Sequence, residues 1–417
     1  MQPPSSTADL AGRGSWESMP AAQQPEWRDH AAYDKTCQRL SSAPPLVSAA
    51  EIKCLRWSLT RLIAADALLL QAGDCAESFY ECTGPHIEEK LRLIDRLGDR
   101  LSDLTGQSVI RVGRMGGQFA KPRSQAVERR GEMSVPSFRG HMVNSEIPAP
   151  AARRADPRRM SWAYEASDRV QRAMRAHRQE RCHAPGAEGP WSSHEALIID
   201  YETSLTRRDP DTRELYLTST HLPWVGERTR HVDGAHVALL ASVANPIGCK
   251  IGPTATPDDV LALCEALNPR REFGRLVLIP RMGRETIREA LPPIVRRVAN
   301  AGHPVIWLSD PMHGNTTLSR QAGLKTRHLI DVITEALRFR DILEEHRQYA
   351  AGLHIEVAAA DVTECVGGPV KSEDDLLRHY SSLCDPRLNA DQAIELIEAW
   401  AKGVASRRDS DDQPERR

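Results

Sequence analysis

The sequence lacks the features that would place it in several large classes of protein. No stretch of its 417 residues approaches the run of about 20 apolar residues needed to span a bilayer. Residues 1–20 have no apolar core of the kind found in secretory signals. Lys plus Arg number 55 against 57 for Asp plus Glu, so no overall charge favours nucleic acid or acidic lipid. We therefore expect a protein that binds neither membranes nor nucleic acid.

Paired cysteines and nucleotide-binding loops are also missing. The nine cysteines are odd in number and include no CxxC pair. This usage is typical of a reduced, cytoplasmic protein in which a thiol is available for chemistry. The glycines at 113, 116 and 117 do not have the spacing of a dinucleotide fingerprint, and there is no phosphate loop of the Walker type. The remaining class is an ordinary globular enzyme, which 40% hydrophobic and 27% charged residues fit.

The two ends of the chain differ in composition from its middle. Residues 1–50 are rich in Pro, Ser, Ala and Gln, which predicts an arm that wraps a body or a partner and is disordered at its start. Residues 404–417 are mostly charged and predict a disordered tail. The catalytic domain is expected between them, over residues 51–403.

Short apolar runs of strand length alternate with amphipathic helical segments in this middle part. Thr256, followed by Pro257 and two acids, is typical of a helix start, and Gly302 of a helix end. Eight strands alternating with helices predict a (β/α)8 (TIM) barrel with an N-terminal extension, and a doubly wound open sheet is the alternative. The predicted strands are 67–71, 108–112, 196–200, 214–218, 247–251, 276–280, 305–309 and 353–357.

Four cations stand at or just beyond the ends of different predicted strands: Arg114, Arg228, Lys250 and Arg281. The carboxyl ends of barrel strands meet on one face, where active sites are built. Four like charges would repel one another there unless an anion lay between them, and guanidinium groups bind phosphate and carboxylate in a bidentate manner. A surface ion pair would explain any one arginine alone, but the set predicts a site for a small, multiply anionic substrate.

A second group near the same ends offers metal ligands: Cys75, His313, Glu356 and the later Asp385. A thiolate, an imidazole and two carboxylates suit a divalent ion such as manganese, cobalt, iron or zinc. Taken singly, Cys75 is better explained as a small buried hydrophobe, His313 as a loop residue and Asp385 as a turn cap. Glu356 is the exception, because an unpaired carboxylate on an apolar strand would be costly.

Several long stretches carry a more specific signal. They are 70–79 (LQAGDCAESF), 117–124 (GQFAKPRS), 193–196 (SHEA), 224–230 (WVGERTR), 310–315 (DPMHGN), 362–368 (VTECVGG) and 384–389 (CDPRLN). In sequence and order they resemble the class II 3-deoxy-D-arabino-heptulosonate 7-phosphate (DAHP) synthases, the first enzymes of the shikimate route. The resemblance runs from about Pro20 to Lys402.

The resemblance implies a (β/α)8 barrel that condenses phosphoenolpyruvate with erythrose 4-phosphate to give DAHP and phosphate, with Mn²⁺ or Co²⁺ as cofactor. Lys250 would donate a proton or clamp phosphate, and Glu227 would stabilise positive charge at carbon 2 or orient water. The implied metal ligands are Cys75, His313, Glu356 and Asp385. The implied phosphoenolpyruvate site is Arg114, Glu227, Arg228, Lys250 and Arg281, and Lys121 and Ser124 would hold the aldose phosphate.

Two departures from the family pattern bear on function. His141 stands where an aspartate is usual, so a contact near the substrate mouth is expected to differ. The segment 157–192 is short, whereas regulated members carry two extra helices there that help to bind aromatic amino acids. The resemblance therefore implies a feedback-insensitive form, similar to the synthases of secondary-metabolite pathways such as phenazine biosynthesis.

Two other functions stay open at this point. An amino-DAHP synthase, which uses an imino sugar phosphate, needs the same anion and metal sites. A non-catalytic barrel would serve only as a scaffold, for instance for a chorismate mutase, but it would have no need for four metal ligands. A homo-oligomer in the cytoplasm is expected in either enzymatic case. Cys384 adjoins Asp385, so it should approach Cys75 if the site forms. One hypothesis is that oxidation then links the two thiols and expels the metal, and the alternative is a buried, inert Cys384.

Overall fold

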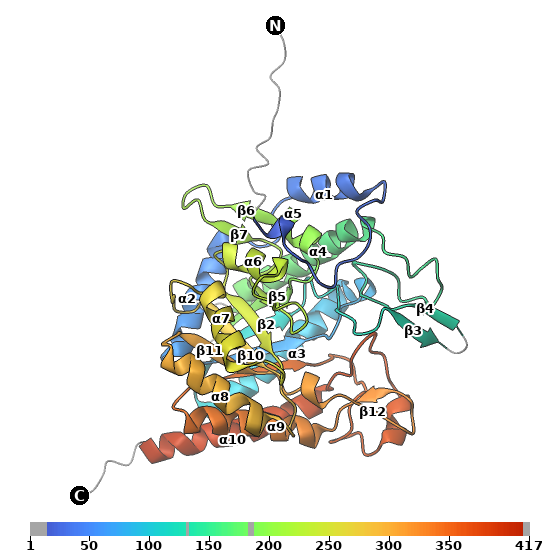
Figure 1. Ribbon diagram of the computed structural model, residues 1–417. Coiled ribbons are helices and arrows are strands. Elements are labelled where there is room, and N and C mark those ends of the chain that lie inside the picture. Colours follow the sequence, from blue (N-terminus) through green and yellow to red (C-terminus); the bar gives the residue numbers. More distant parts are fainter. Residues whose placement is uncertain (1–14, 131–132, 182–186, 412–417) are drawn as a thin grey trace, which may run out of the picture.

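The computed structural model describes residues 15–130, 133–181 and 187–411. Its centre is a closed barrel of eight parallel strands in the spatial order β1, β14, β11, β10, β9, β8, β5, β2 (Figure 1). The barrel has no open edge, because β1 pairs with both β2 and β14. The predicted (β/α)8 barrel is therefore confirmed. The strands are β1 (Ala67–Gly73), β2 (Ser108–Arg114), β5 (Ala187–Glu195), β8 (Leu222–Val225), β9 (Ile247–Ile251), β10 (Leu276–Pro280), β11 (Val305–Ser309) and β14 (Ala350–Glu356).

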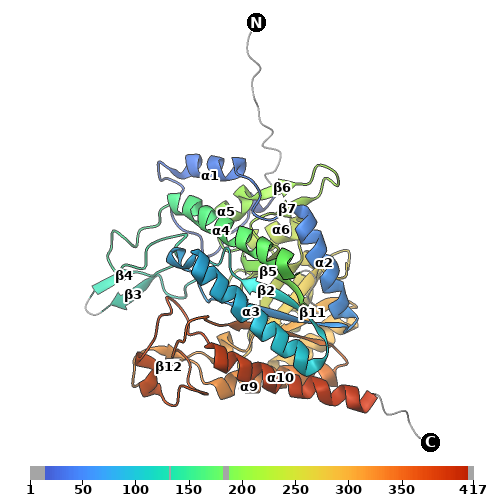
Figure 2. The same ribbon diagram turned by 180° about the vertical axis from the view of Figure 1, so that it is seen from behind.

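Helices surround these strands, as the front and back views show (Figures 1 and 2). Their apolar faces and the outward side chains of the strands form the main core, in which Trp307, Phe339 and Trp400 are fully buried. The helices are α1 (Tyr33–Ser42), α2 (Ala49–Ile63), α3 (Gly84–Thr105), α4 (Arg158–Arg181), α5 (Ile199–Ser204), α6 (Ala235–Ser242), α7 (Pro257–Leu267), α8 (Ile287–Asn300), α9 (Leu329–Glu345) and α10 (Ala390–Asp411). No helix in the described ranges is long and apolar enough to cross a membrane.

The helix boundaries predicted at Thr256 and Gly302 are both present. The hydroxyl of Thr256 accepts a hydrogen bond of 3.1 Å from the backbone N–H of Asp259, whose carboxylate accepts one of 3.0 Å from Thr256 N. This reciprocal box caps α7. Gly302, just after α8, has a φ of 68°, a left-handed conformation that glycine adopts at little cost.

Six of the predicted strands are barrel strands, but those predicted over 196–200 and 214–218 are wrong. The third barrel strand, β5, comes just before the first of these, and its sequence is too polar to form an apolar run. Its polar side chains are buried and paired inside the barrel: Ser193 Oγ accepts from Gln71 Nε2 at 2.9 Å and donates to Gly113 O at 3.0 Å. The apolar residues after it turn into α5 instead.

The strand predicted over 214–218 is wrong for a different reason. Leu215–Leu217 is a strand, β7, but it pairs with β6 (Thr206–Arg208) in a small antiparallel sheet outside the barrel. The barrel strand is β8, which is short and contains Pro223. Two further hairpins lie outside the barrel, β3 (Val127–Arg130) with β4 (Met133–Pro136), and β12 (Thr317–Leu318) with β13 (Lys325–Thr326).

The predicted arm and tail fall partly outside the described residues. From residue 15 onward the arm is packed on the barrel, with Trp16 and Trp27 buried. The tail was expected to begin at residue 404, whereas α10 continues to Asp411. Charged residues are compatible with a helix, and the first proline after the start of α10 is Pro414. Residues 1–14 and 412–417 lie outside the described part of the chain.

Candidate active site

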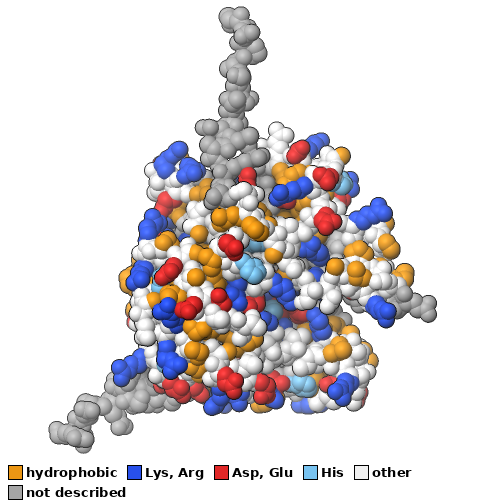
Figure 3. Space-filling view, viewed as in Figure 1, with side chains coloured by type: hydrophobic (Ala, Val, Ile, Leu, Met, Phe, Trp, Pro, Cys, Tyr) orange, Lys and Arg blue, Asp and Glu red, His pale blue; other side chains and the backbone are white. Residues whose placement is uncertain are grey.

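A cavity of about 890 Å³ opens at the carboxyl ends of the barrel strands. It lies between the β3–β4 hairpin and the β12 segment, which Figure 1 shows on one side of the molecule. Its wall is rich in cations, whereas the outer surface in Figure 3 carries Lys and Arg interspersed with Asp and Glu. The cationic side chains that line it are Arg114, Lys121, Arg123, Arg129, Arg228, Lys250, Arg281 and Lys325. The cavity therefore offers an anion-binding surface.

The four predicted metal ligands converge on one edge of this cavity. One donor atom each from Cys75, Glu356 and Asp385 lies within 4.8 Å of the other two. His313 comes next to them, with its Nε2 at 3.1 Å from Glu356 Oε1. Cys75 lies just after β1, His313 after β11 and Glu356 at the end of β14, so the barrel itself brings three distant segments together.

The ammonium of Lys121 lies among these donor atoms. Its Nζ is 2.9 Å from Cys75 Sγ, 3.3 Å from Glu356 Oε1 and 3.5 Å from Asp385 Oδ2. Burial disfavours its charge, but Cys75, Glu356 and Asp385 raise the pKa of Lys121 well above its usual range. The donor set thus stabilises a positive charge, which a metal site must also do.

The electrostatics of the ligand set favour ionised carboxylates. Burial opposes the ionisation of Glu356, but His313, Lys121 and Arg327 hold its pKa well below the usual range. Asp385 is affected in the same direction, with its pKa lowered chiefly by Lys121 against the effect of burial. For Cys75, burial raises the pKa well above the usual value, so a cation is needed to stabilise its thiolate.

Two buried cations near the carboxyl ends of β2 and β9 share a histidine. The Nζ of Lys250 is 2.9 Å from His354 Nε2 and 2.5 Å from Asp310 Oδ2, and Arg114 Nη1 also contacts His354 Nε2. Arg114 in addition lies 2.9 Å from Glu356. Burial lowers the pKa of Lys250 to about 8, although Asp310 opposes the shift.

The other predicted substrate residues line the same cavity. Arg228 Nη2 donates to Ser124 Oγ at 2.7 Å, and Arg281 Nη2 donates to His313 O at 3.1 Å. The carboxylate of Glu227 is already engaged, at 2.9 Å from both Arg230 Nε and Nη2 and at 2.5 Å from Gly252 N. Its oxygens are therefore less available to a substrate than the sequence suggested.

Glu195 belongs to the matched stretch 193–196, but the resemblance implied no role for it. This last residue of β5 lines the cavity, and its Oε1 has no hydrogen-bond partner among the described residues. Burial raises the pKa of Glu195, although Lys121, Lys250 and Arg228 act in the opposite direction. His354 and Asp310 were also missed. The available signal was the same for all three: a polar residue at, within or just after a barrel strand.

Two further residues from the sequence analysis, His141 and Cys384, belong neither to the predicted metal ligands nor to the predicted substrate-binding residues. His141 is buried, accepts a hydrogen bond from Phe79 N at 3.0 Å and pairs with Glu146 at 2.7 Å, away from the residues that line the cavity. Cys384 is close enough to Cys75 for a hydrogen bond between the two thiols, which are both free. The disulfide between them stays a prediction.

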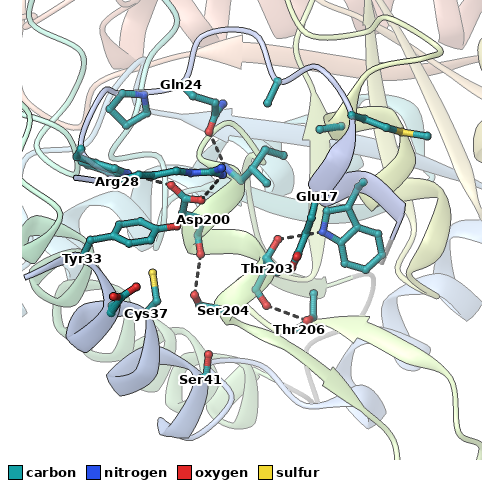
Figure 4. A pocket seen from close by; sticks show the side chains of 18 of the residues that line it. Glu17, Gln24, Arg28, Tyr33, Cys37, Ser41, Asp200, Thr203, Ser204 and Thr206 are labelled. Carbon is teal, nitrogen blue, oxygen red and sulfur yellow. Dashed lines mark hydrogen bonds and ion pairs between the residues drawn. The ribbon is translucent and has the colours of Figure 1, made fainter. Parts of the chain in front are cut away.

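A larger cavity, of about 1300 Å³, lies between the N-terminal arm and α5 (Figure 4). Asp200 is at its centre and accepts from Trp27 Nε1 at 2.9 Å and from Arg28 Nη2 at 2.8 Å. None of the predicted site residues, all of which are described, lines this cavity. Size alone therefore does not mark the candidate active site, which is the smaller cavity.

Comparison with known proteins decides the family. The model of the class-II DAHP synthetase family matches residues 11–188 and 183–401. The chain belongs to this family. A probable phospho-2-dehydro-3-deoxyheptonate aldolase from Pseudomonas fluorescens is 42% identical over 91% of the chain and 94% of its own length. A phospho-2-dehydro-3-deoxyheptonate aldolase from Streptomyces coelicolor is 38% identical over 94% of the chain and 96% of its own length.

A solved structure adds support for the fold alone. The phospho-2-dehydro-3-deoxyheptonate aldolase of Francisella tularensis superposes with a TM-score of 0.53 at 13% identity, covering 89% of this chain and 97% of its own. The expectation that the chain is a transferase of the class II DAHP synthase type is confirmed by its family membership. The family is metal-dependent, and the cluster of Cys75, Glu356 and Asp385 is a possible site for the ion.

Proposed function

We propose that the chain condenses phosphoenolpyruvate with erythrose 4-phosphate and water, giving DAHP and phosphate, at the cavity formed by the strand ends. The observation that carries this proposal is the juxtaposition of a cation-lined cavity with a thiol, an imidazole and two carboxylates at its edge. Family membership supplies the reaction class. The residues supply two kinds of site, one for anions and one for a divalent metal.

The proposed metal ligands are Cys75, His313, Glu356 and Asp385. A mixed set of one sulfur, one nitrogen and carboxylate oxygens fits Mn²⁺ or Co²⁺. The position of the Lys121 ammonium among three of them supports the fit, because that cluster already holds a positive charge. When bound, the ion would supply a Lewis acid for the aldehyde oxygen of erythrose 4-phosphate.

The proposed phosphoenolpyruvate site is built from cations that the barrel fixes in place. Arg114 and Lys250 are both buried and both contact His354, so they cannot move apart without losing a buried hydrogen bond. Arg228 and Arg281 complete the set from the neighbouring loops. Glu227 contributes by holding Arg230 and the backbone of Gly252 beside the cavity.

The proposed aldose phosphate site is the segment of Lys121 and Ser124. Ser124 accepts a hydrogen bond from Arg228, so the two proposed substrate sites are in direct contact. This arrangement would hold two anions next to each other, and much of the rate enhancement would come from their fixed relative position.

The reaction balances with these groups. Carbon 3 of phosphoenolpyruvate forms a bond to carbon 1 of the aldose, water adds at carbon 2, and phosphate leaves. Lys250 would donate a proton or clamp the phosphate. Glu195, whose Oε1 is without a partner among the described residues, is better placed than Glu227 to orient the water or stabilise positive charge at carbon 2.

We propose a finer role for the enzyme from the connection before β5. Helix α4 ends at Arg181 and β5 begins at Ala187, so few residues separate the two elements. This short connection supports a feedback-insensitive synthase of the kind found in secondary metabolism. Phenylalanine, tyrosine and tryptophan, each added at about 1 mM, should leave the initial rate of DAHP formation unchanged. Inhibition by any of them would contradict the proposal.

We also expect a cytoplasmic homo-oligomer, with a chorismate mutase as a possible partner. Light scattering of the chain alone and mixed with a chorismate mutase checks both points. A monomer at micromolar concentration would contradict the first.

The proposed reaction is tested by incubating the metal-loaded protein with both substrates and measuring DAHP. Formation of DAHP with release of phosphate is the expected result. No product from erythrose 4-phosphate, but product from the imino sugar phosphate, would favour the amino-DAHP reaction. No product and no bound metal would favour the scaffold.

A further inference from the structure

The N-terminal arm crosses three of the loops that follow barrel strands. We define residues 20–28 as the strap. Its Pro20 O accepts a hydrogen bond of 2.9 Å from Ala235 N, in the connection after β8. The side chain of Gln24 donates to Leu197 O at 2.8 Å and accepts from Ile199 N at 3.0 Å, in the connection after β5. Figure 4 shows Gln24 and, farther along the strap, Arg28 reaching Asp200.

The third contact of the strap is with the candidate site. The side-chain oxygen of Gln23 accepts a hydrogen bond of 3.0 Å from the backbone N–H of Arg123. Arg123 lies between Lys121 and Ser124, the two residues proposed to hold the aldose phosphate. The loop between β2 and β3 that carries them has no helix or strand, and Pro122 has no N–H to donate. Irregular segments need partners outside themselves for their backbone groups, and Gln23 supplies one.

Arg139 fastens the strap to the same loop a second time. Its guanidinium donates to Gln24 O at 3.2 Å and also to Gln23 O. Its own carbonyl accepts a hydrogen bond of 2.9 Å from Lys121 N. The strap is thus linked to the backbone of residues 121 and 123 by two independent routes, one of which depends on the Gln23 side chain.

The conformation of Gln23 indicates that this contact has a cost. Its φ is 60°, in the left-handed region that residues other than glycine and asparagine seldom adopt. Such strain persists where surrounding contacts impose it, and it is enriched at functional sites. A glycine would fit this backbone more easily, but it would leave Arg123 N without its acceptor.

We infer that Gln23 is a positioning residue, which holds the 121–124 segment in the geometry that binds the aldose phosphate. The inference rests on the proposed function, since it concerns the second substrate of that reaction. Gln23 itself does not line the cavity. Its effect passes through Arg123 N to Ser124, which is hydrogen-bonded to Arg228.

Two substitutions separate positioning from folding. Gln23→Gly removes the acceptor while relieving the backbone, so the thermal stability should stay near that of the wild type. Gln23→Glu keeps an acceptor oxygen at the same reach and is the matched control. We expect Gln23→Gly to raise the KM for erythrose 4-phosphate about fivefold, as the loss of one hydrogen bond would, and to leave the KM for phosphoenolpyruvate within about twofold. Gln23→Glu should retain the wild-type values.

A second readout does not depend on turnover. Hydrogen exchange of a peptide spanning Arg123, in the ligand-free protein, should be faster in Gln23→Gly than in the wild type and in Gln23→Glu. An unchanged KM for erythrose 4-phosphate in Gln23→Gly would overturn the inference, as would equal impairment of the two variants. If the wild type forms no DAHP, the proposed function fails, and unchanged exchange in Gln23→Gly would then overturn the positioning role separately.

Discussion

The ammonium of Lys121 and the sulfur of Cys75 are 2.9 Å apart, in a cluster that also includes Glu356 and Asp385. The positive charge of Lys121 balances part of the negative charge of these donors and would repel a divalent ion bound to them, so the lysine and the ion would compete for the same charge. This relationship connects the metal site to the segment proposed to bind the aldose phosphate.

Removing the charge of Lys121 should strengthen metal binding. In Lys121→Gln the ligands lose their internal competitor, and we expect the Kd for Mn²⁺ to fall by at least about tenfold, while turnover also falls. Lys325→Gln is the matched control, because Lys325 pairs with Asp385 from the exposed side at 2.7 Å. Titration calorimetry measures the Kd for Mn²⁺ of both variants. Equal or weaker affinity in Lys121→Gln would contradict the competition.

Substitution of Cys75 should remove the metal. Serine lacks the thiolate that soft donors provide, so Cys75→Ser should bind well under one ion per chain where the wild type binds one. Cys82→Ser is a suitable control, because Cys82 is also buried but lies outside the donor cluster. Metal analysis of the three purified proteins gives the result. Full occupancy in Cys75→Ser would show that Cys75 is not a ligand.

The pH dependence of the reaction should report Lys250. With a pKa of about 8, its ammonium loses its proton as the pH rises through 8, and the affinity for an anionic substrate is then lost. The kcat/KM for phosphoenolpyruvate, which reports the free enzyme, should therefore fall above pH 8. Lys250→Arg keeps its positive charge above pH 8. Its kcat/KM for phosphoenolpyruvate should therefore be lower than that of the wild type but show no inflection near pH 8. The same inflection in both proteins would assign it to another group.

Glu195 and Glu227, two of the carboxylates that line the cavity, should differ in their effects on the rate. Glu195→Gln replaces a carboxylate whose Oε1 has no hydrogen-bond partner in the described part of the chain, and we expect kcat to fall by roughly a hundredfold with little change in Tm. Glu227→Gln should weaken the contacts with Arg230 and Gly252, so its main effects should be a lower Tm and a higher KM for phosphoenolpyruvate. Steady-state kinetics and thermal melts separate the two. A larger loss of kcat in Glu227→Gln than in Glu195→Gln would instead support the role predicted for Glu227 from the sequence, which is to stabilise positive charge at carbon 2 or to orient water.

The fold could be predicted from sequence wherever a strand is apolar on both faces. β10 and the first four residues of β11 pack against helices and against the barrel interior, so they are continuous apolar runs. β5 is not recognisable in the sequence because its buried positions include Ser193 and His194, whose hydrogen bonds to β1, β2 and α5 are visible only in three dimensions. The sequence of β7 predicts a barrel strand because a short strand gives the same pattern in any sheet.

The candidate site was predictable to the extent that its residues stand at strand ends. Cys75, Lys250 and Glu356 could be placed on one face because the barrel order determines where each end lies. The sequence could not show that Lys121 points into the proposed metal ligands or that the carboxylate of Glu227 is paired with Arg230. Those contacts depend on side-chain directions in loops, which no periodic pattern specifies.

The most direct test of the account is the rate of DAHP formation as a function of metal occupancy. The apoprotein is loaded with Mn²⁺ in steps, and DAHP and phosphate are measured with phosphoenolpyruvate and erythrose 4-phosphate at each step. The account predicts equal amounts of the two products and a rate that rises linearly and saturates at one ion per chain. DAHP formation by the metal-free protein, or none at full occupancy, would contradict it.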